Sequence, residues 1–172
     1  SSIGVLGQSS QAPLAETVRP APEEPYAQSK LEAETALWDV VSRTPLSLTV
    51  IRPPLVHGPG APGNFGRLLG WARNGWPLPL GGVTGNQRSL VGRANLVDFI
   101  QRVLSAPQAA GQTFHVADDG TTSTAALLCT LANAAGHDPK LLRIPPSLLR
   151  AELASPRWEP EPLVMSGVTD PY

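Results

Sequence analysis

Hydrophobic and polar positions along the chain form two repeating patterns. Apolar residues spaced three or four apart predict helices, and short apolar or alternating runs predict strands. The predicted helices cover residues 26–43, 64–74, 95–104, 123–135 and 146–153. The predicted strands cover residues 46–52, 88–91, 112–117 and 140–144. Strands that alternate with helices indicate an α/β fold built on a parallel sheet.

The remaining segments are predicted as loops or strand ends. Residues 1–7 read as the end of a strand, and residues 8–25 form a polar loop with four prolines. Residues 53–63 are predicted to be a rigid loop, and the tail from Ala154 is rich in proline and glutamate. In the helix over 26–43, the residues assigned to the apolar face are Leu31, Ala33, Leu37, Val40 and Val41. Those assigned to its polar side are Lys30, Glu32, Glu34 and Asp39.

Composition excludes several classes of protein. The chain has 172 residues, which fits one domain or parts of two, and 41% of them are hydrophobic, enough for a packed core. The net charge is -1 without a block of like charge, so neither nucleic acid nor an anionic membrane is an expected partner. No apolar run is long enough to span a bilayer. A single cysteine, Cys129, rules out an internal disulfide or a cysteine metal cluster. A cytoplasmic location and no metal site are the resulting expectations.

A tyrosine and a lysine four residues apart open the helix over 26–43 and carry the main chemical signal. Tyr26 and Lys30 share one helix face, so the ammonium can lie near the phenol. A free phenol is a poor base at neutral pH, and a nearby positive charge favours its ionised form. Tyr26 could then exchange a proton with a substrate hydroxyl, while Ser2 hydrogen-bonds to the same oxygen. On its own, this spacing more often marks the start of an ordinary surface helix.

Five segments in order resemble the signatures of one enzyme family. They read Ser1-Ser-Ile-Gly-Val-Leu-Gly, Tyr26-Ala-Gln-Ser-Lys-Leu-Glu-Ala-Glu, Val50-Ile-Arg-Pro-Pro-Leu-Val-His-Gly-Pro-Gly, Asn86-Gln-Arg-Ser-Leu-Val with Asn95-Leu-Val-Asp-Phe-Ile, and Thr113-Phe-His-Val-Ala-Asp. Together they are similar to the extended short-chain dehydrogenase/reductases, in particular the NAD-dependent epimerase/dehydratase family of nucleotide-sugar enzymes. The resemblance covers about residues 1–149.

The resemblance implies a partial Rossmann-like doubly wound parallel sheet with a small α/β substrate-binding lobe. Residues 1–56 would be the C-terminal part of the NAD(P)-binding domain. Residues 57–172 would form the substrate lobe, with residues 89–117 returning to the sheet. The family opens with a βαβ unit whose glycine-rich turn holds the cofactor pyrophosphate, and this unit has no counterpart in the sequence. We therefore expect the chain to be the C-terminal part of such an enzyme.

One segment matches the glycine-rich pattern literally, after a predicted strand and before a predicted helix. It reads Gly58-Pro-Gly60-Ala-Pro-Gly63. Its two prolines lack the backbone N–H groups that phosphate binding uses, and no acidic residue ends a second strand at the expected distance. We therefore interpret the match as a coincidence.

The resemblance also assigns roles to individual residues. Ser2, Tyr26 and Lys30 match the catalytic triad of the family, and Tyr26 and Lys30 would contact the cofactor as well. The nicotinamide pocket would be lined, largely through backbone atoms, by Pro53, Pro54, Leu55 and Val56.

Two further residues match positions near the diphosphate of the nucleotide sugar. Arg88 suits this task because its planar guanidinium can bind two phosphate oxygens, and a surface ion pair is the alternative. Asn64 is as well explained by a plain helix cap. The Ile3-Gly4 pair replaces the two acids of the sugar dehydratases, which argues against water elimination. His57 could contact substrate, although a lone histidine in a loop is more often structural.

The expected reaction is hydride transfer at a carbon of a nucleotide-activated sugar, with NAD or NADP as cofactor. Epimerisation and ketone reduction both remain open, as do the sugar, the nucleotide and assembly as a homodimer. Two other readings also remain: a non-catalytic relative that only binds NAD(P) or a partner, and an inactive truncated remnant of such an enzyme.

Overall fold

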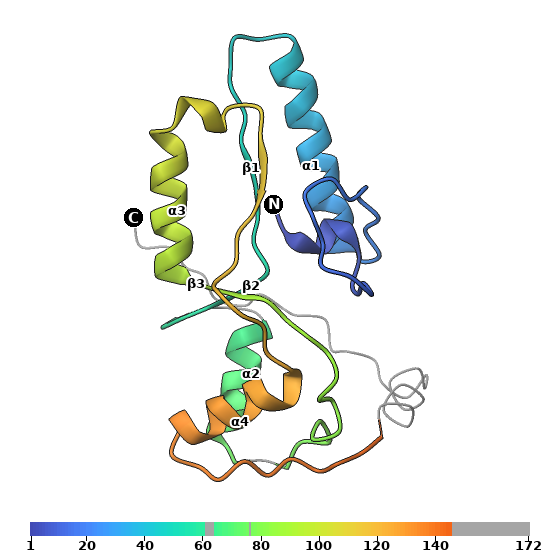
Figure 1. Ribbon diagram of the computed structural model, residues 1–172, viewed down its shortest axis with the longest axis vertical. Coiled ribbons are helices and arrows are strands. Elements are labelled where there is room, and N and C mark those ends of the chain that lie inside the picture. The colour runs from blue at the N-terminus through green and yellow to red at the C-terminus, as the bar shows by residue number, and fades with distance from the viewer. Residues whose placement is uncertain (61–63, 76, 146–172) are drawn as a thin grey trace, which may run out of the picture.

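The computed structural model describes residues 1–60, 64–75 and 77–145 (Figure 1). Helices and strands alternate in this part of the chain. Its helices are η1 (Ile3–Leu6), α1 (Pro25–Ser42), α2 (Asn64–Arg73), α3 (Arg93–Leu104), η2 (Pro107–Ala109) and α4 (Thr124–Ala134). Its strands are β1 (Val50–Arg52), β2 (Leu55–His57), β3 (Leu90–Gly92) and β4 (Thr113–His115).

The strands pair in parallel, as the sequence predicts. β1 pairs with β4, with Val50 opposite Thr113, and β2 pairs with β3, with Leu55 opposite Leu90. In Figure 1, α1 and α3 lie on opposite sides of β1 and β4. The ring centroids of Phe99 in α3 and Phe114 in β4 are 5.6 Å apart. Helices on both sides of parallel strands confirm the predicted α/β class.

The main hydrophobic core lies between α2 and α4, in the lower half of Figure 1. Its buried members are Phe65, Ala72, Leu127, Leu131 and Ala132. Partly buried leucines of β2 and β3 pack against this cluster and connect it to the strands. Ser123 caps α4 by accepting a hydrogen bond from Ala126 N at 3.1 Å, which confirms the predicted start of this helix.

Several predicted strands are shorter than expected or absent. Residues 46–49 and 116–117 lie outside β1 and β4, and β3 begins two residues later than predicted. The predicted strand over 140–144 is wrong, because only Leu141 forms a bridge, to Leu78. The loop predicted over 53–63 contains β2, because pairing with β3 extends the backbone there. The predicted helix over 146–153 and the tail lie outside the described residues.

The first residues form a short 3-10 helix and not the predicted strand end. The side chain of Ser2 accepts a hydrogen bond from Gly4 N at 3.2 Å and so caps η1. A hydroxyl that satisfies a nearby N–H stabilises such a turn locally. The strand prediction failed because apolar spacing does not detect this cap.

The face of α1 that packs on the neighbouring segments is not the predicted apolar face. Glu34, assigned to the polar side, is 5% exposed, whereas Leu37 and Val40 are 49% and 40% exposed. Ala27 is the other buried residue of α1, and it lies two turns before Glu34 on the same side. The prediction was wrong because the helix buries a charged group, which hydrophobic periodicity cannot indicate.

The division into residues 1–56 and 57–172 stays a prediction. Within the second part, β4 pairs with β1 of the first part, while β3 pairs with β2.

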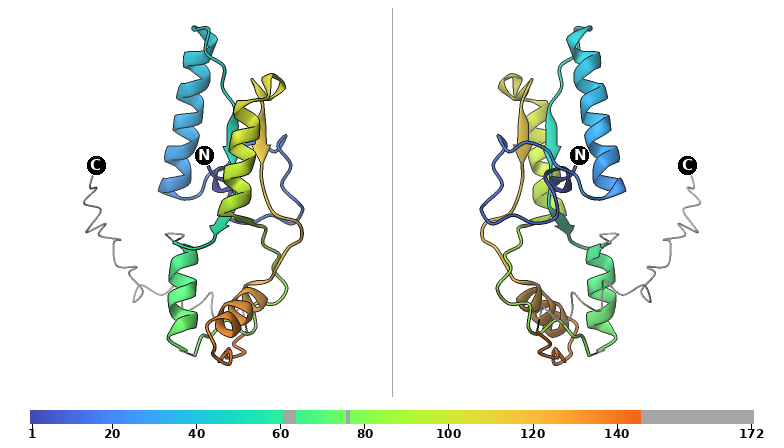
Figure 2. Two further views of the ribbon diagram at one scale, coloured as in Figure 1. Left: turned by 90° about the vertical axis from the view of Figure 1, so that its left-hand side faces the viewer. Right: turned by 90° about the vertical axis from the view of Figure 1, so that its right-hand side faces the viewer.

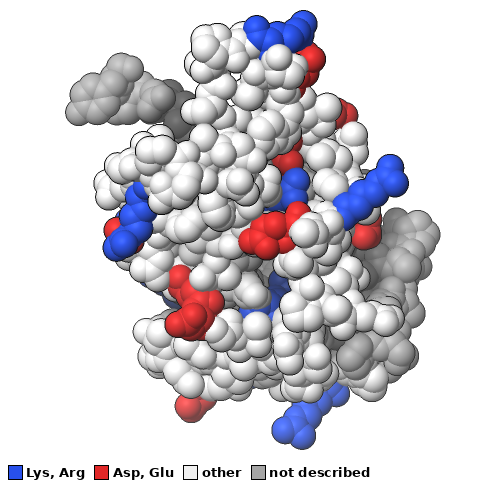
Figure 3. All heavy atoms as spheres, turned by 45° about the horizontal axis from the view of Figure 1, so that its top comes forward, with Lys and Arg blue, Asp and Glu red and all other residues white. Residues whose placement is uncertain are grey.

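Figure 3 shows one face of the molecule, on which acidic and basic groups are scattered among uncharged atoms without a continuous basic surface. None of the described helices is both long enough and apolar enough to cross a membrane.

Replacement of Leu128 by alanine tests the position of the core. Leu128 in α4 is 1% exposed, so the change should leave a cavity and lower the free energy of unfolding by about 2–5 kcal/mol. Leu104 in α3 is 82% exposed, so Leu104→Ala should change it by less than about 0.5 kcal/mol. Urea unfolding of both variants measures the difference. Equal losses would contradict the burial of Leu128 in α4.

Candidate functional site

Ser2 lies beside the first turn of α1. A Cβ built at Gly4 would lie 3.5 Å from Ser2 Oγ and 3.7 Å from Ala27 Cβ, ordinary van der Waals distances, so η1 packs directly beside α1. Ser2 is half-buried, and its hydroxyl still has a proton to donate while it accepts from Gly4 N.

Tyr26 and Lys30 occupy the first turns of α1. Pro25 sits at the start of the helix, where its fixed φ favours helix formation and its missing N–H is not needed. Lys30 Nζ lies 5.3 Å from the centroid of the Tyr26 ring, a cation–π distance. Tyr26 is 59% exposed. No described acidic group forms an ion pair with Lys30.

The segment from Pro53 to Val56 meets the Ser2 segment at the end of β1. Ile3 N donates a hydrogen bond to Pro53 O at 3.0 Å. Pro53 and Pro54 connect β1 to β2, and Leu55 and Val56 belong to β2. The structure thus brings together three predicted parts of the site: the serine, the helix of Tyr26 and Lys30, and the start of the predicted nicotinamide-lining segment.

The loop between Ser2 and Tyr26 is held at β4. His115 Nδ1 lies 3.1 Å from Leu14 O, and the carboxylate of Glu16 accepts a hydrogen bond from His115 N at 3.1 Å. This backbone hydrogen bond is the main cause of a lowered pKa of Glu16. Figure 2 shows the loop extending from α1 toward the β4 side of the molecule. The loop therefore follows a defined path between the two catalytic candidates.

A buried ion pair that the sequence did not indicate connects α1 to β1. Arg52 Nη2 donates to Glu34 Oε2 at 2.6 Å, and Arg52 Nε donates to Glu34 Oε1 at 3.0 Å. The side chains are 7% and 6% exposed, respectively. The hydroxyl of Ser1 also donates to Glu34. No local pattern could have revealed the pair, because the two residues are 18 positions apart on different elements.

The two phosphate-binding candidates are separated in sequence from the residues described so far. Arg88 is exposed and exchanges two backbone hydrogen bonds with Thr122, at 2.8 and 2.9 Å. No ion pair to its guanidinium occurs within the described part of the chain, so the surface ion pair has no support there. Asn64 begins α2, and its side chain is outside what the structure describes.

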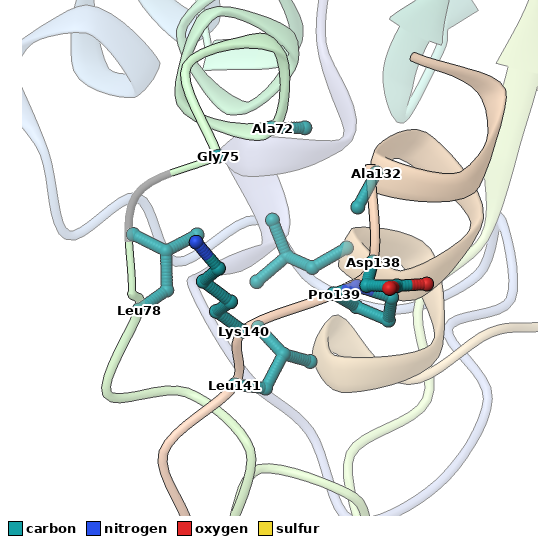
Figure 4. Close-up of a pocket in the computed structure, with 9 residues that line it drawn as sticks. Ala72, Gly75, Leu78, Ala132, Asp138, Pro139, Lys140 and Leu141 are labelled. Carbon is teal, nitrogen blue, oxygen red and sulfur yellow. The ribbon is translucent and has the colours of Figure 1, made fainter. Parts of the chain in front are cut away.

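Two hollows within the described part of the chain lie apart from the predicted catalytic residues. A cavity of about 10 Å³ lies beside α2 and α4, lined by Ala72, Leu78, Lys140 and neighbouring residues (Figure 4). This volume is about that of a single water-sized probe. An open groove of about 370 Å³ lies between α3 and the segment after β4, along Phe99 and Asp118. Neither hollow includes Ser2, Tyr26 or Lys30.

Comparison with known proteins identifies the family of this chain. The profile of the NAD dependent epimerase/dehydratase family matches residues 1–117. A UDP-glucose 4-epimerase of Vibrio cholerae is 41% identical over 125 residues, which cover 73% of this chain and 38% of that protein. The chain belongs to the NAD-dependent epimerase/dehydratase family. It spans well under half the length of this relative.

Solved structures show the same fold. RMD from Pseudomonas aeruginosa complexed with NADPH is 26% identical, with a TM-score of 0.68 over 84% of this chain and 52% of that chain. The UDP-glucose 4-epimerase of Thermus thermophilus in complex with NAD is 22% identical, with a TM-score of 0.67 over 93% and 57% of the two chains. Their likeness confirms the predicted Rossmann-like architecture of this family member.

A second polar cluster in this epimerase-family chain lies where β2 and β3 end and α3 begins. The carboxylate of Asp118 accepts hydrogen bonds from Asn95 Nδ2 and Gly92 N, both at 2.8 Å. His57 Nε2 lies 3.1 Å from Asp118 Oδ2. The hydrogen bond from Asn95, followed by those from His57 and Gly92, outweighs partial burial and lowers the pKa of Asp118. His57 therefore has a structural partner. The sequence did not indicate Asp118 as that partner because it lies 61 positions after His57.

Replacement of Asp118 by asparagine tests this cluster. The anion accepts three hydrogen bonds at the start of α3, so Asp118→Asn should lower the free energy of unfolding at neutral pH by about 1 kcal/mol. The pKa of Asp118 is lower in the folded state than in the unfolded state. This stability is therefore present above the unfolded value, about 3.9, and is lost as pH falls through the folded value.

The measurement is urea unfolding of wild type and variant between neutral pH and pH about 3. The difference in free energy between the two should shrink across the acid range. Asp119→Asn changes the adjacent exposed aspartate and serves as the control. A difference that stayed constant with pH would show that the Asp118 charge does not stabilise this cluster.

Proposed function

We propose that this chain carries the proton-transfer and substrate side of an NAD(P)-dependent nucleotide-sugar epimerase. The observation that supports the proposal is the packing of the Ser2 turn beside the start of α1, which carries Tyr26 and Lys30, together with its hydrogen bond to Pro53 at the end of β1. Membership in the NAD-dependent epimerase/dehydratase family agrees with it. Between epimerisation and reduction, the relative with 41% identity favours epimerisation, because it is a UDP-glucose 4-epimerase.

Tyr26 is the proposed acid and base. Its ring lies beside the Lys30 ammonium, with Nζ 5.3 Å from the ring centroid. The oxygen of Tyr26 would take the proton of a sugar hydroxyl as the attached carbon is oxidised, and would return it when the carbon is reduced. The exposure of Tyr26 leaves its hydroxyl accessible to a substrate.

Ser2 is the proposed partner of the same substrate oxygen. Its hydroxyl is placed by the Gly4 hydrogen bond and can donate its proton outward. A donor placed before the reaction stabilises the charge that develops on the substrate oxygen. Ser2 therefore orients the substrate oxygen, and Tyr26 moves the proton of that oxygen.

Bound NAD or NADP would supply the hydride acceptor and donor. The residues present fit the nicotinamide end of such a cofactor. Lys30 has no described acidic partner, so its ammonium can donate to ribose hydroxyls. Pro53, Pro54, Leu55 and Val56 would line the nicotinamide pocket through their backbone, next to the Ile3 hydrogen bond.

A nucleotide sugar is the proposed substrate, with UDP as the nucleotide that the Vibrio cholerae relative's name suggests. Arg88 would bind the diphosphate through its guanidinium, which has no described ion-pair partner and is exposed. Asn64, at the start of α2, would contribute near the same diphosphate. The substrate lobe would then be residues 57–172, with residues 1–56 on the cofactor side.

Replacement of Tyr26 by phenylalanine tests the proposed function. The native protein is assayed with UDP-glucose and NAD by following formation of UDP-galactose. Loss of the phenol removes the proton carrier, so kcat should fall roughly 10²- to 10⁴-fold with a small change in KM. Tyr172→Phe removes the other phenol of the chain and should leave kcat unchanged. Unchanged kcat in Tyr26→Phe would refute the acid-base role and favour a non-catalytic relative.

Replacement of Arg88 by alanine tests the diphosphate contact separately. Loss of a charged hydrogen-bond donor should raise KM for the UDP-sugar roughly 10- to 100-fold and leave kcat within about threefold. Arg43→Ala removes an exposed arginine at the end of α1 and is the matched control. Steady-state kinetics with varied UDP-sugar gives both constants. An unchanged KM in Arg88→Ala would remove Arg88 from the substrate site.

A further inference from the structure

We propose that the buried Glu34–Arg52 ion pair positions the catalytic face of α1 against the end of β1. That face carries Tyr26 and Lys30, and the end of β1 leads directly into Pro53. Glu34 and Arg52 are thus positioning residues that act through others and do not touch the reactants. This inference rests on the function proposed above for Tyr26 and Lys30.

The two buried residues of α1 lie on either side of the lysine. Ala27 packs beside Gly4, and Glu34 binds Arg52. Residues 27, 30 and 34 are spaced three and four apart, so they form one stripe along the helix. Lys30 therefore lies between the two buried residues, Ala27 and Glu34, and Tyr26 directly precedes Ala27. A rotation of α1 about its axis would break both contacts and move both catalytic groups.

The geometry of the ion pair determines orientation as well as distance. Arg52 uses Nε and Nη2 to reach the two oxygens of Glu34, at 3.0 and 2.6 Å. Two parallel hydrogen bonds from a planar guanidinium define the plane in which the carboxylate must lie. Arg52 is the last residue of β1, and the carbonyl of the next residue, Pro53, accepts the Ile3 hydrogen bond. The pair thus connects α1 to the backbone that meets the Ser2 segment.

Stability alone does not explain why charged residues occupy this position. The free energy needed to remove two charges from water offsets much of their electrostatic attraction. Apolar residues of similar volume often stabilise the folded state as well or better. A bidentate ion pair provides what apolar contacts provide poorly, a single allowed orientation. The exposed Leu37 and Val40 show that α1 does not use its largest apolar residues for this contact.

Glu34 remains charged in this environment. Burial by itself raises the pKa of its carboxyl, but the hydrogen bonds from Arg52 and Ser1 and the charge of Arg52 outweigh burial and lower it below the ordinary value. The pair is therefore ionised at neutral pH. Ser1 is exposed, so water can replace its contact if Glu34 is changed.

The test replaces the pair by two apolar side chains of similar length, Glu34→Met with Arg52→Met, in the native protein. Thermal unfolding should show a Tm close to wild type, because no buried charge is left unpaired. The kcat for epimerisation of UDP-glucose should nevertheless fall roughly 10- to 100-fold with KM nearly unchanged, since small misplacements of catalytic groups have effects of this size. Glu34→Gln keeps the shape and one acceptor, and should show a smaller fall in kcat.

A second measurement does not depend on activity. In nuclear magnetic resonance spectra of this chain, the nuclear Overhauser contact between the Ala27 methyl and Gly4 should weaken in the double variant. The signals of the Lys30 side chain, shifted by the Tyr26 ring, should move as well. Signals from α2 and α4 should stay in place. The control, Asp39→Met with Arg43→Met, removes an exposed ion pair of the same helix and should leave both the spectra near Gly4 and kcat unchanged.

The outcomes separate the two proposals. A folded double variant with low kcat and altered Ala27 and Lys30 signals supports positioning. A folded double variant with wild-type kcat and unchanged signals overturns it, even if Tyr26→Phe is inactive. If Tyr26→Phe is fully active, the proposed function fails. Independently of that result, unchanged Ala27 and Lys30 signals in the double variant would overturn the positioning role. If the double variant does not fold, Glu34→Gln with Arg52→Gln, which leaves no buried charge, decides by the same two readouts.

Discussion

In the upper half of Figure 1, a buried ion pair joins a helix to a strand. Glu34 of α1 and Arg52 of β1 form a bidentate ion pair in a region where α1 buries little else. Loss of one partner would leave an uncompensated buried charge, which generally costs about 3–5 kcal/mol. Because α1 carries Tyr26 and Lys30, the packing of this helix and the arrangement of the site follow from the same contact.

The lower half is held together differently. There α2 and α4 bury leucines, alanines and Phe65 against each other, and the leucines of β2 and β3 extend this core toward the strands. Apolar contacts of this kind are strong but not directional. The directional contacts lie at strand ends: Arg52 at the end of β1 binds Glu34 of α1, and Asp118 binds His57, Gly92 and Asn95 at the ends of β2 and β3. The first is beside the proposed catalytic residues, and the second fixes the start of α3 next to β2.

The proposed site has the location that is usual in parallel α/β proteins, where functional groups lie at the carboxyl ends of strands. Ser2 precedes η1, Pro53 follows β1, and Tyr26 opens α1, so all three lie at points where the chain changes structure. Such points combine exposed side chains with backbone held by neighbouring elements. Tyr26 is largely exposed while the residue after it, Ala27, is buried. Such an arrangement would let the proposed proton carrier face a substrate from a rigid support.

The sequence by itself determined the α/β class and the order of the helices, and it supplied the segments of the proposed site. Helix limits could be predicted because propensity, caps and proline positions are local, as at Pro25 and Ser123. Strand limits were less accurate, since β2 is extended only because β3 lies beside it. The tertiary structure alone decided that Glu34 is buried and that Asp118 binds His57 across 61 positions. Both outcomes depend on a partner far away in the chain, and periodicity along one helix carries no information about that partner.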